Sequence, residues 1–257
     1  MVHGLSVADH VLVGVAALAG GGVNALAGGG TLITFPALVA TGVSVKAANI
    51  TNTVALCPGY FGGTYAQRKD LEAQRHRLPL FAVAAGLGGL TGSLLLLATS
   101  EAVFKKIIPF LILGAVTLLC FQDKLRPKAA ANAHEARRPG PREVIPIYAV
   151  AIYGGYFGAG LGIMTLAVLG VLIDDLFTRI NALKQAVSFV VNTCAAIFLS
   201  FSGKVQWSLA AVMAVAALIG GSLGGHLAGR LAPKKLRLVV IVFGFAVGLV
   251  YFWRAFF

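Results

Sequence analysis

The chain has 257 residues, of which 58% are hydrophobic and 12% charged, and its mean hydropathy is +0.86. Apolar runs of about 20 residues recur with almost no charge inside them, which is typical of transmembrane helices and excludes an ordinary soluble domain. The runs do not alternate apolar and polar residues, which excludes a transmembrane β-barrel. The net charge of +12 is concentrated between the apolar runs, so it indicates membrane topology and not nucleic-acid binding.

Two halves of the chain match each other at a constant offset of 132 residues. Phe81–Gly92 and Met213–Gly224 are identical at seven of 12 positions, and the same offset places Ala27–Gly30 on Ala159–Gly162. A shared Gly and Ala content would account for one such match, but not for several at one offset. The sequence therefore predicts two homologous repeats.

The predicted elements follow one plan in each repeat, a helical hairpin and then three transmembrane helices. The first repeat is expected at residues 1–121, a basic linker at residues 122–145 and the second repeat at residues 146–257. The hairpins are expected at Val13–Ala40 and Pro146–Leu172, and the spans at 47–66, 79–99, 107–121, 180–200, 207–228 and 238–256.

The basic loops change ends between the repeats. Gln67–Leu78 carries four basic residues and its counterpart Ser200–Trp207 carries one, whereas Arg230–Arg237 carries four and its counterpart Ala98–Lys106 carries two. Because basic loops face the cytoplasm, the repeats are expected to have inverted topology. With the linker in the cytoplasm, both termini lie outside, and each hairpin begins and ends on one side of the membrane. Each hairpin is therefore either re-entrant or made of two short spans.

Glycines interrupt both hairpins, in the sequences AGGGT (Ala27–Thr31) and AGLGI (Ala159–Ile163). A helix broken inside a membrane has free N–H groups that lipid cannot satisfy, and such groups at a helix N-terminus bind anions. The alternative is that these glycines only allow close helix packing. We expect the breaks to supply the following substrate-binding residues: Asn24, Gly28, Gly29, Gly30, Thr31, Gly160 and Gly162.

A helix with a polar face follows each hairpin. Spacing of three and four residues puts the polar side chains on one face, and the 132-residue offset places Asn49 on Asn181 and Asn52 on Lys184. We expect these faces to meet beside the glycine breaks and to add the following substrate-binding residues: Asn49, Asn52, Thr53, Asn181, Lys184, Gln185 and Ser188.

Lys184 is the ionisable residue that lies within an apolar run. Such residues are costly in a membrane and usually line a functional cavity. The alternative is that Lys184, about one turn from its helix start, extends its ammonium to the membrane surface. Amide and hydroxyl donors with one cation suit a small oxyanion.

Groups that would support other chemistries are absent from the predicted spans. No carboxylate is expected in mid-membrane to relay a proton or bind a cation, and the three cysteines lack metal-ligand spacing. We expect no cofactor, no metal site and no enzymatic activity. An inside-negative potential favours exit of an anion by about 2.3 kcal/mol per charge per 100 mV, so an exporter would need no coupling ion.

The sequence resembles the TauE/SafE family of bacterial sulfite and organosulfur-anion exporters over nearly its whole length. The resemblance rests on AGGGTLITFPAL and AANITN in the first half and on GAGLG and NALKQAV in the second. It implies a secondary transporter in the bacterial cytoplasmic membrane that exports sulfite or a sulfonate such as sulfoacetate. The half-sites are unequal, since Val168 stands where the first repeat has Pro36.

Three alternatives stay open from the sequence. The protein is an anion channel, it transports another small anion or organic acid, or it is a membrane-embedded subunit whose basic linker docks a cytoplasmic partner. The expected partners are the substrate anion and the lipid bilayer, and a homo-oligomer is compatible with the sequence.

Overall fold

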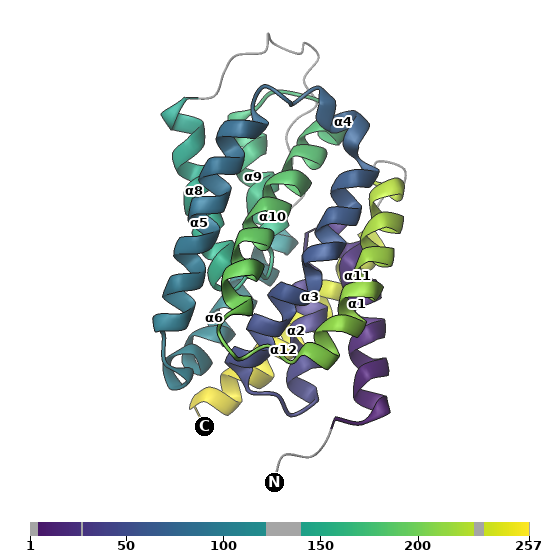
Figure 1. The fold of residues 1–257 in the computed structure, drawn as a ribbon, viewed down its shortest axis with the longest axis vertical. Helices are drawn as coiled ribbons and strands as arrows, with labels where there is room; N and C mark the ends of the chain where they lie inside the picture. Colours follow the sequence, from purple (N-terminus) through teal and green to yellow (C-terminus); the bar gives the residue numbers. More distant parts are fainter. Residues whose placement is uncertain (1–4, 27, 122–139, 229–233, 257) are drawn as a thin grey trace.

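The computed structural model describes residues 5–26, 28–121, 140–228 and 234–256, and all regular elements in these ranges are helices (Figure 1). The expected all-α fold is confirmed. The first half contains α1 (Val7–Leu26), α2 (Thr31–Ala40), α3 (Val45–Ala66), α4 (Arg68–Glu72), α5 (Leu78–Ala98) and α6 (Glu101–Cys120). The second half contains α8 (Pro141–Tyr156), α9 (Leu161–Leu172), α10 (Phe177–Ser200), α11 (Trp207–Leu227) and α12 (Lys234–Phe256).

Local capping explains where the helices begin. The Ser100 side chain accepts a bond from the N–H of Val103 at 3.3 Å, so α6 begins six residues earlier than the expected span at 107–121. α8 begins at Pro141, inside the predicted linker, because proline suits the first helical position and Glu143 accepts from the N–H of Gly140 at 2.7 Å. The rest of the linker at 122–139 and the first residues of the basic loop at 230–233 lie outside the described residues.

Within the described residues, five helices are long and apolar enough to cross a membrane, namely α1, α5, α6, α10 and α11. Their outward faces expose large apolar side chains, among them Val83 and Leu87 on α5 and Val215 and Leu223 on α11, as a lipid-facing surface requires. α3 has 22 residues but carries so many polar side chains that it falls below the hydropathy of the other spans. The protein is a multi-pass membrane protein.

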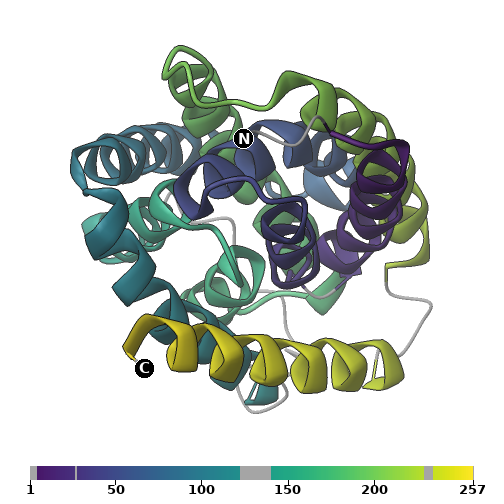
Figure 2. The same ribbon diagram turned by 90° about the horizontal axis from the view of Figure 1, so that it is seen from below.

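The two halves interlock. α1 packs along α11 and α8 packs along α5, so each half's first helix lies against the other half (Figures 1 and 2). α3 packs against α11, α10 packs against α5, and α3 and α10 also contact each other. The start of α1 and the end of α12 lie at one end of the molecule, and α4 and the start of α8 lie at the opposite end (Figure 1).

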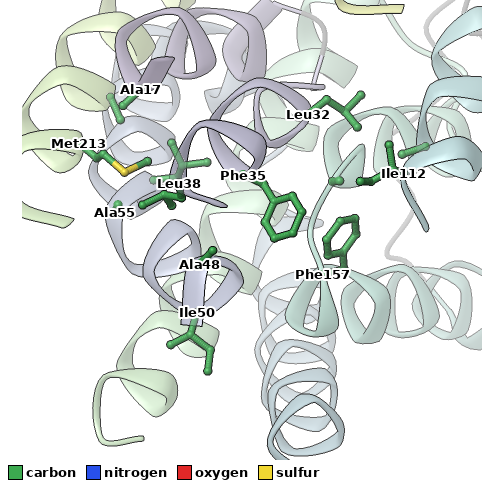
Figure 3. Packing of buried hydrophobic residues seen from close by; sticks show 14 of the residues in the cluster. Ala17, Leu32, Phe35, Leu38, Ala48, Ile50, Ala55, Ile112, Phe157 and Met213 are labelled. Carbon is green, nitrogen blue, oxygen red and sulfur yellow. The ribbon is translucent and has the colours of Figure 1, made fainter. Parts of the chain in front are cut away.

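Aromatic packing fixes the second half of the first hairpin against the second hairpin. Phe35 of α2 and Phe157, which follows α8, meet edge to face with ring centroids 5.4 Å apart (Figure 3). Both rings are fully buried and also contact Tyr251 or Phe104. Aromatic pairs of this geometry contribute about 0.5–1.5 kcal/mol beyond the area that they bury. The helix breaks are therefore held in a packed apolar surrounding.

Candidate functional site

Both hairpins are interrupted at the predicted glycines. Between α1 and α2 the backbone of Gly28 has φ +88°, and between α8 and α9 Gly158 and Gly160 have φ +76° and +74°. Residues with a side chain rarely adopt this left-handed conformation, which is why glycine occupies these positions. The breaks are thus built into the sequence.

The two breaks touch each other through backbone atoms. A Cβ added to Gly28 would lie 2.6 Å from the carbonyl carbon of Gly162, and a Cβ added to Gly162 would lie 2.6 Å from the Cα of Gly28. No side chain fits between them. The glycines therefore have a packing role as well as a conformational one.

Hydrogen bonds within the first hairpin engage two of the backbone donors that the sequence assigned to substrate. The N–H of Gly28 donates to the carbonyl of Val23 at 2.9 Å, and the N–H of Gly30 donates to Oδ1 of Asn24 at 2.7 Å. A Cβ on Gly29 would point toward Leu119 and Val240, each 3.6 Å away, so this position faces α6 and α12. The side chain of Asn24 thus stabilises the conformation of the break. Thr31, which is buried, is the first residue of α2.

A charged group of residues lies at the end of α1, namely Asn24, Asn181, Lys184 and Gln185, and Ser188 is buried one turn farther along α10. Lys184 is 1% exposed, and its Nζ donates to the carbonyls of Asn24 at 3.2 Å and Ala25 at 3.5 Å. Nδ2 of Asn181 donates to Ala25 at 3.5 Å as well. The ammonium therefore points into the protein, and the interpretation of Lys184 as a residue that reaches the membrane surface is wrong.

Among the described residues, no carboxylate forms an ion pair with Lys184. An ion pair in this part of the chain joins Arg179 to Asp175 at 3.3 Å and does not include Lys184. The carbonyls at the end of α1 carry the negative end of that helix dipole and offset part of the cost of burying the ammonium. A buried charge without a partner remains expensive. An anion bound beside Lys184 would neutralise it.

An uncharged group on α3 consists of Asn49, which lies at the end of α8, and of Asn52 and Thr53, which are buried within about one turn of Asn49. Nδ2 of Asn49 donates to the carbonyl of Tyr156 at 3.0 Å, and Oγ1 of Thr53 donates to the carbonyl of Asn49 at 3.0 Å. Asn49 thus binds the end of α8 as Asn181 binds the end of α1. The structure thus brings Asn181 and Lys184 to one broken helix and Asn49 to the other.

Buried polar atoms without a partner concentrate on α3 and α10. Leaving such an atom unsatisfied costs about 1–3 kcal/mol, so a cluster of them indicates a place where water or a polar ligand completes the bonding. Among the described residues the atoms on these helices are Asn49 Oδ1, Asn52 Oδ1, Asn181 Oδ1, Gln185 Nε2, Gln185 Oε1, Ser188 Oγ and Asn192 Oδ1.

Sequence reasoning missed two buried residues beside these groups. Gln67, which the sequence placed in a basic loop, is 5% exposed, and its Oε1 accepts from Nδ2 of Asn181 at 2.6 Å. Lys46, which the sequence placed in a loop, is buried and donates to the carbonyls of Leu97 at 3.0 Å and Thr99 at 2.6 Å. Both lie next to polar loops, so no sequence signal marks them as buried.

Comparison with known proteins decides the family. A sequence model of the family described as sulfite exporter TauE/SafE matches residues 12–251. The chain belongs to the TauE/SafE family. The resemblance of the glycine and asparagine motifs is thereby confirmed over nearly the whole chain.

Curated relatives of this TauE/SafE protein are named as transporters. The probable membrane transporter protein YfcA of Escherichia coli K12 is 26% identical over 246 residues, which cover 93% of this chain and 89% of the relative. A probable membrane transporter protein of Haemophilus influenzae is 27% identical over 232 residues, which cover 90% and 86%. The probable membrane transporter protein ORF9 of Sinorhizobium sp. is 26% identical over 247 residues, which cover 91% and 89%. No solved structure matches the chain.

Proposed function

We propose that this TauE/SafE protein exports a small sulfur-containing anion, sulfite or an organosulfonate such as sulfoacetate, across the bacterial cytoplasmic membrane by alternating access. The observation that carries the proposal is the burial of Lys184, whose Nζ binds carbonyls at the end of a broken helix and has no carboxylate partner among the described residues. The proposal assigns no enzymatic step and no cofactor to the chain.

The contacts between the halves support an inverted repeat. An asparagine of each half donates a hydrogen bond to the broken helix of the other half, since Asn181 binds the end of α1 and Asn49 binds the end of α8. The packing of α1 on α11 and of α8 on α5 likewise pairs the first helix of each half with a helix of the other half. Transporters with this architecture bind substrate where the repeats meet, and in this chain the broken helices of the two halves meet at the contact of Gly28 with Gly162, so the substrate is expected beside this contact.

The distribution of charge supports an orientation with α4 in the cytoplasm. Arg68, Lys69, Arg75 and Arg77 lie in or beside α4, and the first turn of α8 at the same end carries Arg142. Basic residues favour the cytoplasmic side, so both termini lie outside and the linker lies inside. In this orientation the charged group at Lys184 is reached from the cytoplasm, where an exported anion begins its passage.

In alternating access, the charged group and the uncharged group would be exposed in turn to opposite sides of the membrane. The charged group loads the anion on Lys184 with donors from Asn181 and Gln185. The uncharged group, with Asn52 and Thr53, receives the anion without a fixed cation and releases it. The inside-negative membrane potential, which favours exit of an anion, gives the passage its direction.

Flux from proteoliposomes tests the proposal. Vesicles loaded in parallel with sulfite, sulfoacetate, sulfate or chloride are given an imposed membrane potential, and efflux by the wild type is compared with Lys184→Ala. Lys105→Ala is the matched control, because Lys105 is exposed on α6. We expect saturable, potential-driven efflux of a sulfur anion that collapses in Lys184→Ala and persists in Lys105→Ala.

Other outcomes have distinct meanings. Flux that does not saturate and shows no counter-transport would identify a channel. Efflux of a sulfur anion that is unchanged in Lys184→Ala would remove Lys184 from the site. Absence of efflux for all four anions would overturn the proposed substrate.

A further inference from the structure

A basic cavity opens at the end of the molecule that carries α4. It has a volume of about 370 Å³ and lies between the end of α3, α4 and the end of α11. Its lining includes Gln67, Arg68, Lys69, Asp70 and His226. A space of this size holds a small organic anion together with some of its water.

The charges around the cavity favour an anion. Two cations, Arg68 and Lys69, oppose the single carboxylate of Asp70 among the described lining residues. Nδ1 of His226 lies 2.7 Å from the carbonyl of Ser222, so this nitrogen donates and Nε2 is left for another partner. The cavity is therefore positively charged and contains a further polar group at its rim.

One wall of the cavity is rigid. A Cβ on Gly225 would lie 2.7 Å from the Cβ of Ala66 and 3.0 Å from the carbonyl oxygen of Gly63, which shows how closely α11 and α3 pack there. α3 and α11 therefore pack closely at this wall, whereas Gln67, which also lines the cavity, bonds to Asn181 in the protein interior.

Gln67 connects the cavity with the charged group. It is the residue between α3 and α4, it lines the cavity, and its Oε1 accepts from Asn181 at 2.6 Å. Its Nε2 donates to the carbonyl of Gly63 at 3.1 Å, which holds the side chain in this position. Asn181 in turn binds Ala25, whose carbonyl also accepts from Lys184.

We propose that the basic cavity collects the anion from the cytoplasm and that the hydrogen-bonded pair of Gln67 and Asn181 is the gate between this cavity and Lys184. The ligand class is a small anion bearing sulfonate or a related oxyanion group. This inference rests on the proposed function for its direction of transport. Opening requires breaking the bond of Gln67 to Asn181, and the joint between α3 and α4 is the place where that motion occurs.

Thiol labelling measures charge selectivity in the cavity. In a background with Cys57, Cys120 and Cys194 replaced by alanine, Ala228→Cys places a thiol on the cavity lining. The purified protein is treated with sulfonatoethyl methanethiosulfonate, which is anionic, and with its trimethylammonium analogue. After correction for reactivity with a free thiol, we expect the anionic reagent to react at least about fivefold faster. Replacing Arg68 and Lys69 with glutamine should abolish this preference. Equal rates in the unsubstituted cavity, or a preference for the cation, would overturn the role of the cavity.

Labelling behind the gate measures the role of Gln67. Ala25→Cys places a thiol beside the charged group, where Ala25 is fully buried. We expect Gln67→Ala to raise the labelling rate of this thiol by about tenfold or more with the anionic reagent. Gln206→Ala is the matched control, since Gln206 precedes α11 at the opposite end of the molecule, and it should leave the rate unchanged. An unchanged rate in Gln67→Ala, or an equal rise in Gln206→Ala, would refute the gate.

The labelling experiments and the flux experiment test separate proposals, so one proposal can fail while the other is retained. The expected labelling pattern without sulfur-anion efflux would retain the cavity and gate and overturn the proposed substrate. Sulfur-anion efflux without charge preference in the cavity would retain the proposed function and overturn this inference. Gel filtration of each variant establishes that it folds. If Ala25→Cys does not fold, the Ala228→Cys experiment still tests the role of the cavity.

Discussion

Alanine at Gly28 should destabilise the protein because it separates the two helix breaks. Gly28 has φ +88°, a conformation that costs a residue with a side chain about 1–2 kcal/mol. The new Cβ would also lie 2.6 Å from the carbonyl carbon of Gly162 and 2.7 Å from the nitrogen of Ile163. These are backbone atoms and cannot rotate away, so overpacking adds about 1–3 kcal/mol. The expected total is about 2–5 kcal/mol.

Two other glycines separate the contributions to this total. Gly42 has φ +86° with no atom within 4 Å of an added Cβ, so Gly42→Ala carries the conformational cost alone. Gly29 has ordinary contacts of 3.6 Å and no left-handed φ, so Gly29→Ala should be nearly neutral. The difference between Gly28→Ala and Gly42→Ala therefore isolates the contact with Gly162.

The stabilities of the three variants can be ranked by thermal unfolding of the purified proteins in one mild detergent, with tryptophan fluorescence as the signal. The midpoint should fall by about 3 °C for each kcal/mol lost. We expect Gly28→Ala to have the lowest midpoint, Gly42→Ala an intermediate one, and Gly29→Ala one close to the wild type. A midpoint for Gly28→Ala equal to that of Gly42→Ala would refute the contact between the breaks.

Three further predictions follow from the contacts at helix ends and loops. Asn49→Ala removes the donor to the carbonyl of Tyr156 and should lower the free energy of unfolding by about 1–3 kcal/mol, as measured by thermal unfolding; an unchanged midpoint would contradict that hydrogen bond. Lys46→Met removes two bonds to the end of α5 and should lower the midpoint while leaving the KM for anion efflux unchanged; a raised KM would place Lys46 in the transport path. Burial, followed by the charge of Arg77, lowers the pKa of His76, so the unfolded chain binds the proton more readily and stability should fall as pH drops below about 6.5. His76→Gln should reduce that fall in midpoint, and an identical pH profile would show that His76 does not cause it.

The helix breaks were predictable because their cause is local. Three consecutive glycines at Gly28–Gly30 cannot continue a stable helix, and the matching glycines at the 132-residue offset mark the second break. The polar face that contains Asn181 and Lys184 was predictable for a similar reason, because helical spacing depends on a few neighbouring residues. The burial of Lys184 agrees with the cost of leaving a charge in lipid.

The contacts between the halves were not predictable from the sequence. The packing of Gly28 on Gly162 depends on the path of two hairpins that lie far apart in the chain. The division of the polar residues into a charged and an uncharged group depends on which broken helix each asparagine meets. Gln67 resembles a loop residue in sequence, since it directly precedes Arg68, and its burial follows from its bond to Asn181 in the other half.

Equilibrium binding of sulfite to the purified protein tests the central claim most directly. Lys184→Met keeps the approximate length of the side chain and removes its charge, and Lys46→Met is the matched control because it removes a buried lysine of α3 that binds the end of α5. Isothermal titration calorimetry should show an affinity at least about tenfold weaker in Lys184→Met, because the variant loses the Nζ donor and its charge, and an unchanged affinity in Lys46→Met. Equal sulfite affinity in the wild type and in folded Lys184→Met would contradict the assignment of Lys184 as the charge that binds the anion.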